Sequence, residues 1–404
     1  QLYAREADGP DTRPLQFRPY PGLAAFDRAQ RRFYFGREEL TRKLWQRCQD
    51  LVGDARATRL LAILAPSGFG KSSVARAGLL AEIERRPLKF AQTQDGAMPA
   101  RIATLKPGTH PLKALQAVMP TDTALPAASP QVLLVDQFEE VYTLCTDAAE
   151  RDAFVDRLLA VAQTPECPTL VVLTLRTDFI GETGQKHPAL NRLFGAQAEL
   201  VTAMSADDLR RSIADPAGCL GRPLDDATVD LLLTRVQGQE GALPLLGFAL
   251  SQIWEGVLAG RAPDDTLRQI GGVGGALAGK AHAIYGALSD REKATARRAL
   301  VRLVRLGEGT RDTRRRMAVH ALCGRGETED MVLSVLRKLA SEQARLVTLL
   351  SDGGDAQAEV THEALLEHWA ELRGWVDESR KDRALHDRAS DAAGRWHSTG
   401  RPSG

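Results

Sequence analysis

The stretch from residue 59 to residue 80 places the strongest constraint on what this chain can fold into. The apolar run from Leu60 to Leu64 is typical of a buried strand, and a turn rich in glycine follows it. Lys71 then opens a segment with small residues along one side, which predicts a helix. In such a strand–loop–helix unit the backbone N–H groups of the loop and the helix N-terminus form an anion-binding concavity. The pattern therefore predicts a phosphate-binding loop.

Each position of this loop has an expected role. In the pattern G-x-x-x-x-G-K-[ST] the lysine reaches the β- and γ-phosphates and the hydroxyl binds Mg²⁺, roles that fall to Lys71 and Ser72. Ala65 replaces the first glycine and lacks only its freedom of positive φ. The alternative is a chance Gly/Ser turn before a helix, which we disfavour because motif and context agree. The residues expected to contact nucleotide here are Pro66, Ser67, Gly68, Phe69, Gly70, Lys71, Ser72 and Ser73.

Composition narrows the class of protein. The chain has 404 residues, enough for two or three domains, with 43% apolar and 26% charged residues, as in an ordinary globular protein. Its net charge of +1 provides no general attraction to nucleic acid or membrane. The five cysteines are scattered without C-x-x-C spacing, which argues against a disulfide framework and a zinc site. With no apolar run of membrane-spanning length and no signal peptide, we expect a cytoplasmic location. The first residue is Gln, which is compatible with a piece of a longer protein.

Further strands alternate with helical segments in the first half of the chain. Short apolar runs cover residues 100–105, 131–136 and 169–175, and helical patterns lie near 111–118 and 147–162. This alternation predicts an α/β fold with a parallel sheet and helices on both faces. Ligands of such sheets bind outside the carboxyl ends of the strands. The loop after Leu64, Asp136 and Arg176 are all predicted to lie there.

The polar residues at these strand ends suggest phosphoryl chemistry. Asp136 ends an apolar run, as expected for the second acidic site that holds Mg²⁺. Glu139 and Glu140 follow directly and could orient or deprotonate the attacking water, the alternative being a solvated first turn of a helix. Arg176 could contact the γ-phosphate and stabilise charge in the transition state, or it could form a salt bridge with Asp178.

From Ser205 onward the pattern is helical. Helices are predicted to begin at Ser205, to cover 225–236, and to run from Gly241 to about Leu258. Residues 271–275 are rich in glycine and fit either a hinge or a turn before a helix at 276–288. Helices at 289–307 and 328–342, followed by a hairpin at 344–361, suggest a winged helix, and the tail 371–396 reads as an exposed helical connector. The cluster Arg314–Arg316 is by default a solvated turn, and is too short to argue a nucleic-acid surface.

Several of these segments together resemble the STAND class of signal-transduction ATPases, and specifically the bacterial "novel STAND" NTPase group. The resemblance covers roughly residues 19–396. Its most specific parts are Val-Asp-Gln-Phe-Glu-Glu at 135–140 and Thr-His-Glu-Ala-Leu-Leu at 361–366. The other segments that carry it are Pro-Tyr-Pro-Gly-Leu-Ala-Ala-Phe at 19–26, Phe-Gly-Arg-Glu at 35–38, the loop at 66–73, Leu-Arg-Thr-Asp-Phe at 175–179 and Gly-Ala-Leu-Pro-Leu-Leu at 241–246.

The resemblance implies a switch that combines a P-loop nucleotide-binding domain, a helical domain and a winged-helix domain. Members resemble apoptotic ATPases and NACHT proteins, which hold ADP when closed, exchange it for ATP, and open into oligomers that activate a fused effector. Arg37 is then expected near the nucleotide, Arg176 as the sensor arginine, and Pro244 near adenine, although two residues separate it from Gly241. Thr361-His362-Glu363 is similar to the Met-His-Asp motif, so His362 is expected at the β-phosphate of ADP.

This reading implies five parts: an N-terminal segment (1–35), the nucleotide-binding domain (36–203), a helical lid domain (204–270), a winged-helix domain (271–370) and a helical connector (371–404) toward a C-terminal repeat sensor outside this chain. The expected cofactors are ATP or ADP with Mg²⁺, and the expected partners are a second copy and a fused effector, without membrane or nucleic acid. Two alternatives remain: an ADP-clamped module that does not hydrolyse ATP, and a DNA-acting ATPase of the initiator type, which the near-zero net charge disfavours.

Overall fold

The computed structural model divides the chain into two compact units. The first comprises residues 1–276 with 350–354, and the second comprises 277–349 with 355–404. The structure describes residues 17–91, 100–119, 130–145, 147–164, 168–238, 241–306, 312–341, 344, 346–352, 355–361 and 364–380.

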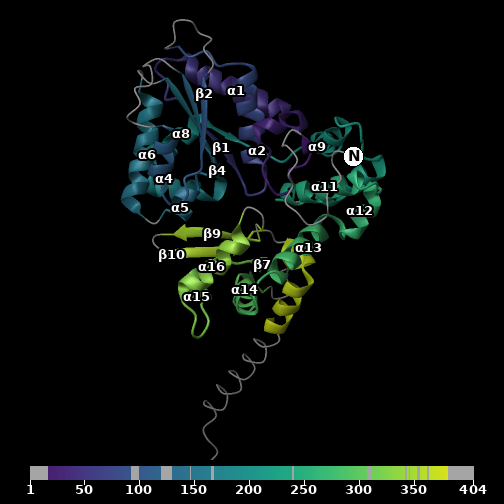
Figure 1. The fold of residues 1–404 in the computed structure, drawn as a ribbon. Helices are drawn as coiled ribbons and strands as arrows, with labels where there is room; N and C mark the ends of the chain where they lie inside the picture. The colour runs from purple at the N-terminus through teal and green to yellow at the C-terminus, as the bar shows by residue number, and fades with distance from the viewer. Residues whose placement is uncertain are drawn as a thin grey trace, which may run out of the picture. The chain divides into compact units, whose positions relative to one another are not determined.

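A parallel β-sheet forms the centre of the first unit (Figure 1). Its strands are β1 (Leu60–Ala65), β2 (Arg101–Leu105), β3 (Gln131–Val135), β4 (Thr169–Arg176) and β5 (Ala198–Leu200). Their order across the sheet is β2-β3-β4-β1-β5, and every neighbouring pair is parallel. The α/β fold with a parallel sheet is thereby confirmed, and β5 is a strand that the sequence analysis did not predict.

Helices cover both faces of this sheet, since alternate residues of each central strand pack on opposite sides. Leu60 and Leu64 of β1 pack on one face with α6 (Ala148–Gln163) and α8 (Pro188–Gln197), whereas Leu61 and Ile63 pack on the other with α1 (Glu38–Gly53) and the helix after the glycine-rich loop. That helix consists of α2 (Lys71–Ser73), a π-helical stretch η3 (Val74–Leu80) and α3 (Ala81–Arg85). Burial on both sides explains why the strands are continuous apolar runs.

The remaining helices of the first unit frame the sheet or follow it. They are η2 (Arg28–Phe33), α4 (Pro111–Val118), α5 (Glu140–Thr143), η4 (Thr177–Phe179), α7 (Ile180–Lys186), α9 (Ala206–Gly218), α10 (Asp226–Val236), α11 (Leu243–Leu258) and α12 (Pro263–Gln269). Ser205 caps α9 and Asp225 caps α10, each by accepting a hydrogen bond from a backbone N–H of the first turn. Among the described residues, no helix is both long and apolar enough to cross a membrane.

The second unit contains helices and two small sheets. Its elements are α13 (Gly272–Gly286, which begins just before the unit does), α14 (Asp290–Arg302), β6 (Val304–Arg305), β7 (Thr313–Arg314), β8 (Met317–Ala318), α15 (Val319–Leu322), α16 (Glu329–Ala340), β9 (Val347–Asp352, of which residues 350–352 are assigned to the first unit), β10 (Asp355–Val360) and α17 (Ala364–His368), followed by a helix over 370–380. The sheets have the orders β8-β10-β9 and β6-β7. The helix predicted for 289–307 therefore ends earlier, because β6 pairs with β7.

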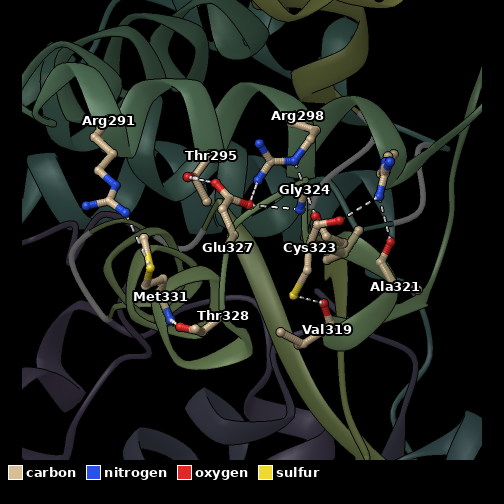
Figure 2. Close-up of polar contacts among 12 residues, drawn as sticks. Arg291, Thr295, Arg298, Val319, Ala321, Cys323, Gly324, Glu327, Thr328 and Met331 are labelled. Carbon is tan, nitrogen blue, oxygen red and sulfur yellow. Dashed lines mark hydrogen bonds and ion pairs between the residues drawn. The ribbon is translucent and has the colours of Figure 1, made fainter.

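A partly buried carboxylate joins α14 to the turn before α16 (Figure 2). Glu327 accepts hydrogen bonds from the Gly324 N–H at 2.9 Å and the Thr295 hydroxyl at 2.5 Å, and it forms an ion pair with Arg298. These donors hold the pKa of Glu327 at about 2, with the hydrogen bond from Arg298 as the largest cause. The cluster therefore links the turn before α16 to α14, and the charge of Glu327 is paired with that of Arg298.

The start of the predicted exposed tail belongs to the core of the second unit instead. Leu372 and Val376 are buried, and the Trp375 ring lies 4.8 Å from that of Tyr285 and 5.5 Å from that of Trp369. The prediction of an exposed connector is therefore wrong for residues 371–380. The mixed charge of this helix concealed a narrow apolar stripe three to four residues apart. Residues 381–396 lie outside the described residues.

Candidate functional site

The loop between β1 and α2 has the backbone of a phosphate-binding loop. Gly68 and Gly70 have φ of +81° and +84°, which L-residues with a side chain rarely adopt, and Gly70 is the residue before the helix. A Cβ built on Gly68 would lie only 2.6 Å from the Cα of Gly241, so a second segment packs directly on the loop. The two glycines thus provide the turn that the sequence pattern predicted, and Gly68 also allows a close approach that the pattern did not predict.

Lys71 and Glu139 face each other at the end of the sheet. The Lys71 Nζ lies 3.5 Å from Oε1 of Glu139, and both residues are buried. The other carboxylate oxygen of Glu139 accepts the backbone N–H of Arg176 at 3.3 Å. Glu139 therefore connects the loop lysine to the carboxyl end of β4.

Ser72 and Asp136 lie together as expected for a cation site. The Ser72 hydroxyl donates to Oδ1 of Asp136 at 2.8 Å, and Asp136 is 1% exposed. The Thr174 hydroxyl of β4 donates to the same oxygen at 2.7 Å and accepts the backbone N–H of Gln137 at 2.8 Å. A hydroxyl and a carboxylate are hard oxygen ligands that suit Mg²⁺ beside phosphate groups, so the residues present fit this ion.

Glu140 lies in different surroundings from its neighbour Glu139. Its carboxylate accepts the Gly108 N–H at 3.0 Å, in the turn after β2. Burial raises the pKa of Glu140 to about 7, and the charges of Glu139 and Asp136 add to the shift, although Gly108 and Lys106 oppose it. The structure therefore brings Glu139, and not Glu140, to the loop lysine.

Arg176 is engaged by a carboxylate two residues along the chain. Its Nε and Nη2 atoms donate to the two oxygens of Asp178 at 3.1 and 2.7 Å, and its guanidinium carbon lies 5.4 Å from the centre of the Phe179 ring. The alternative of a salt bridge with Asp178 thus describes this conformation. Because Arg176 stands at the carboxyl end of β4 beside Ala65, it remains close to the loop.

Arg37 and Pro244 flank the loop from two other segments. The Arg37 Nη2 lies 3.5 Å from the carbonyl oxygen of Phe69, and burial lowers the pKa of Arg37 from its ordinary value. Pro244 is in the first turn of α11, whose preceding glycine packs on Gly68. A Cβ built on Gly70 would lie 3.8 Å from Leu243. The first turn of α11 therefore lies over the loop.

The N-terminal segment, described here from residue 17 to residue 35, also reaches the loop, which the sequence analysis did not predict. The backbone N–H of Phe26 donates to the Ser73 hydroxyl at 3.1 Å. Tyr20 is buried and donates to the carbonyl of Ile213 in α9 at 2.5 Å, and its ring lies 6.5 Å from that of Trp254 in α11. The sequence did contain a signal of this packing, because the segment has aromatic residues between prolines in an otherwise polar stretch.

Two further residues of the site were missed. The first is Thr174, whose hydroxyl donates to the same oxygen of Asp136 as the Ser72 hydroxyl does. The second is Arg76, which forms an ion pair with the other oxygen of Asp136 at 2.7 Å. A charged residue within the apolar stretch of η3 is a visible signal for Arg76. His362, which was expected at the β-phosphate, lies outside the described residues, as does Glu363. Among the described residues, no group of His, Cys, Asp and Glu side chains could hold a metal ion on protein ligands alone.

This site defines a P-loop NTPase. It combines a phosphate-binding loop and its lysine with a paired hydroxyl and carboxylate at the carboxyl ends of a parallel sheet. The family model described as Novel STAND NTPase 1 (nSTAND1) matches residues 19–404, and the chain belongs to this family. No curated protein matches the chain significantly.

Solved structures provide more distant likenesses. The ORC1 protein of Aeropyrum pernix in complex with DNA has 15% sequence identity and a TM-score of 0.45, over 87% of this chain and 94% of that one. A RuvB variant of Thermotoga maritima has 14% identity and a TM-score of 0.42, over 83% of this chain and 95% of that one. Domain III of the replication initiation protein DnaA of the same organism has 8% identity and a TM-score of 0.41, over 57% and 90%.

Proposed function

We propose that this chain is an ATP/ADP-dependent switch that is closed with ADP and opens and self-associates with ATP to activate an effector. The observation that carries the proposal is the packing around the phosphate-binding loop. Three separate segments contact it: Gly241 before α11 packs on Gly68, Arg37 before α1 reaches the Phe69 carbonyl, and Phe26 binds Ser73. A nucleotide bound there would lie beside three segments that are distant in sequence, so that exchange of the nucleotide would change their packing, which is what a nucleotide-controlled conformational change requires.

Within this site the residues have distinct proposed roles. Lys71 and the backbone N–H groups of residues 67–73 would bind the phosphates, Ser72 and Asp136 would hold Mg²⁺, and Pro244 would lie near adenine. When bound, Mg²⁺ would neutralise phosphate charge and assist phosphoryl transfer. Glu139 is the proposed base for the attacking water, because it is the carboxylate that faces Lys71 at 3.5 Å. Arg176 would leave Asp178 to contact a γ-phosphate.

The second unit supports a winged-helix assignment through the order of its elements. Helix α14, strand β8, helices α15 and α16 and the strands β9 and β10 follow one another, with β8 antiparallel to β10. We propose that this unit is the winged-helix domain and that His362, directly after its hairpin, senses the β-phosphate of ADP. The five-part division of the chain remains part of the same proposal.

An ADP-clamped module without turnover is the second candidate. It is favoured by two ion pairs within the chain. The side chains of Lys71 and Arg176, both proposed to act on the phosphates, are paired with Glu139 and Asp178 respectively. This pairing describes a resting conformation equally well, and hydrolysis that resets the switch would be slow for the same reason.

Light scattering on the Glu139→Gln variant tests the switch. This variant should bind ATP but not hydrolyse it, so Mg²⁺–ATP should give a larger assembly than ADP does. Arg176→Ala in the same background is the matched control and should reduce the ATP-dependent assembly, because it removes the proposed sensor of the γ-phosphate. The same mass with ATP and with ADP in the Glu139→Gln variant would contradict the proposal.

A further inference from the structure

Asp136 has a counter-ion inside the chain. Its Oδ1 accepts hydrogen bonds from Ser72 and Thr174, while its Oδ2 forms an ion pair with Nη2 of Arg76 at 2.7 Å. A carboxylate that is 1% exposed is stable as an anion only with compensating charge or hydrogen bonds. Arg76 provides that charge from the π-helical stretch directly after the loop.

Arg76 also faces the N-terminal segment. Its Nη1 lies 3.8 Å from Oδ2 of Asp27, whose side chain is 45% exposed and caps η2. The Nε of Arg76 is buried and has no hydrogen-bond partner among the described residues. The guanidinium therefore lies between a buried and an exposed carboxylate, with one donor unused.

We propose that Arg76 is a positioning residue that competes with the divalent cation of the nucleotide for Asp136. The inference rests on the proposed function, which places that cation at Ser72 and Asp136. Two cations on one buried carboxylate repel each other strongly, because the surroundings screen charge poorly. Binding of the cation thus displaces the guanidinium toward Asp27.

The displacement relays the state of the site to the N-terminal segment. Asp27 is followed directly by η2, and the neighbouring Phe26 is hydrogen-bonded to Ser73. A guanidinium that moves from Asp136 to Asp27 strengthens one attachment of this segment at the moment the cation binds. The segment therefore responds to metal occupancy in addition to nucleotide.

Titration of Mn²⁺ into the ADP-saturated chain, with free Mn²⁺ measured by electron paramagnetic resonance, tests the competition. Arg76→Gln should raise the Mn²⁺ affinity about tenfold, since it removes the competing charge, and Arg76→Lys should fall between it and the unsubstituted chain. Asp27→Asn keeps the helix cap but removes the second carboxylate, so it should lower the affinity about twofold to threefold. Arg85→Gln is the matched control, because Arg85 lies on the same helical run but pairs with Glu82, and should change nothing.

The outcomes separate this inference from the proposed function. An unchanged or weaker Mn²⁺ affinity in Arg76→Gln overturns it, and so does an equal rise in Arg85→Gln, which would reflect net charge alone. If Arg76→Gln does not fold, Asp27→Asn decides: a lower affinity supports the competition and an unchanged one contradicts it. Failure of the proposed function appears separately, as an unsubstituted chain that binds no ADP either with or without metal, or as equal ADP affinity in Lys71→Ala.

Discussion

Glu139 and Glu140 are neighbours in the chain, but their side chains have different environments. Glu139 faces Lys71 and the end of β4, whereas Glu140 accepts the Gly108 N–H and burial raises the pKa of Glu140 to about 7. The sequence does not separate the roles of the two glutamates, because a run of two carboxylates after Asp136 contains no information on which one faces the loop. The backbone turns directly before them at Gln137, which has φ of +59°.

Substitution of each glutamate should separate their roles. Glu139→Gln should lower the rate of ATP hydrolysis by about a hundredfold or more while ATP binding is retained, because it removes the proposed base. Glu140→Gln keeps an acceptor for the Gly108 N–H and should change the rate by less than about tenfold. Single-turnover hydrolysis and equilibrium binding of ATP measure both effects. A larger loss in Glu140→Gln than in Glu139→Gln would reverse the assignment.

The raised pKa of Glu140 has a consequence for stability. Its pKa is about 7 in the folded chain against 4.5 for an ordinary glutamate, so between these values the folded state binds more protons than the unfolded state. The free energy of unfolding should therefore fall as the pH rises from about 4.5 to about 7. Urea unfolding of the nucleotide-free chain near both limits measures this dependence. Glu140→Gln should reduce it, and an identical dependence in the variant would show that Glu140 does not cause it.

At the scale of elements, the contact between the loop and the segment before α11 is the feature on which nucleotide control depends. Gly68 combines a positive φ with a Cβ position 2.6 Å from the Cα of Gly241. Sequence patterns predicted the loop and α11 separately. The sequence could not predict this contact, because nothing in the residues around two glycines in separate turns indicates that the glycines lie close together.

Gly68→Ala should therefore lower the free energy of unfolding by more than backbone strain alone would. An L-residue at positive φ costs about 1–2 kcal/mol, and here the backbone of Gly241 must also move. Gly221→Ala is the matched control, because Gly221 has φ of +69° with nothing within 4 Å of the built Cβ. We expect a larger loss of unfolding free energy and a loss of ADP affinity in Gly68→Ala only. Urea unfolding and ADP titration check this, and equal effects of the two variants would show that the contact is unimportant.

The elements themselves were largely predictable, and the exceptions have physical reasons. Buried parallel strands read as apolar runs, so β1, β3 and β4 were recognised, whereas β5 is too short to show a pattern. Thr174 lies inside such a run and reads as an ordinary strand residue. Only the order of the strands, which places β4 between β1 and β3, brings its hydroxyl to Asp136. The partner of Arg76 depends on the same order.

At the scale of the whole molecule, family membership and the site agree on a P-loop NTPase, and we propose that this chain is a switch held by ADP. The site that carries the claim has a loop lysine, a hydroxyl–carboxylate pair and contacts from three segments of the first unit. Parts so distant in sequence are expected to retain a nucleotide tightly when they close on it together.

The nucleotide content of freshly purified protein is the most direct test of this claim. Denaturation followed by chromatography of the released small molecules should yield ADP in near-stoichiometric amount, and none from Lys71→Ala, whose lost ammonium group is expected to contact the phosphates. A nucleotide-free preparation of the unsubstituted chain, or the same ADP content in Lys71→Ala, would contradict the claim.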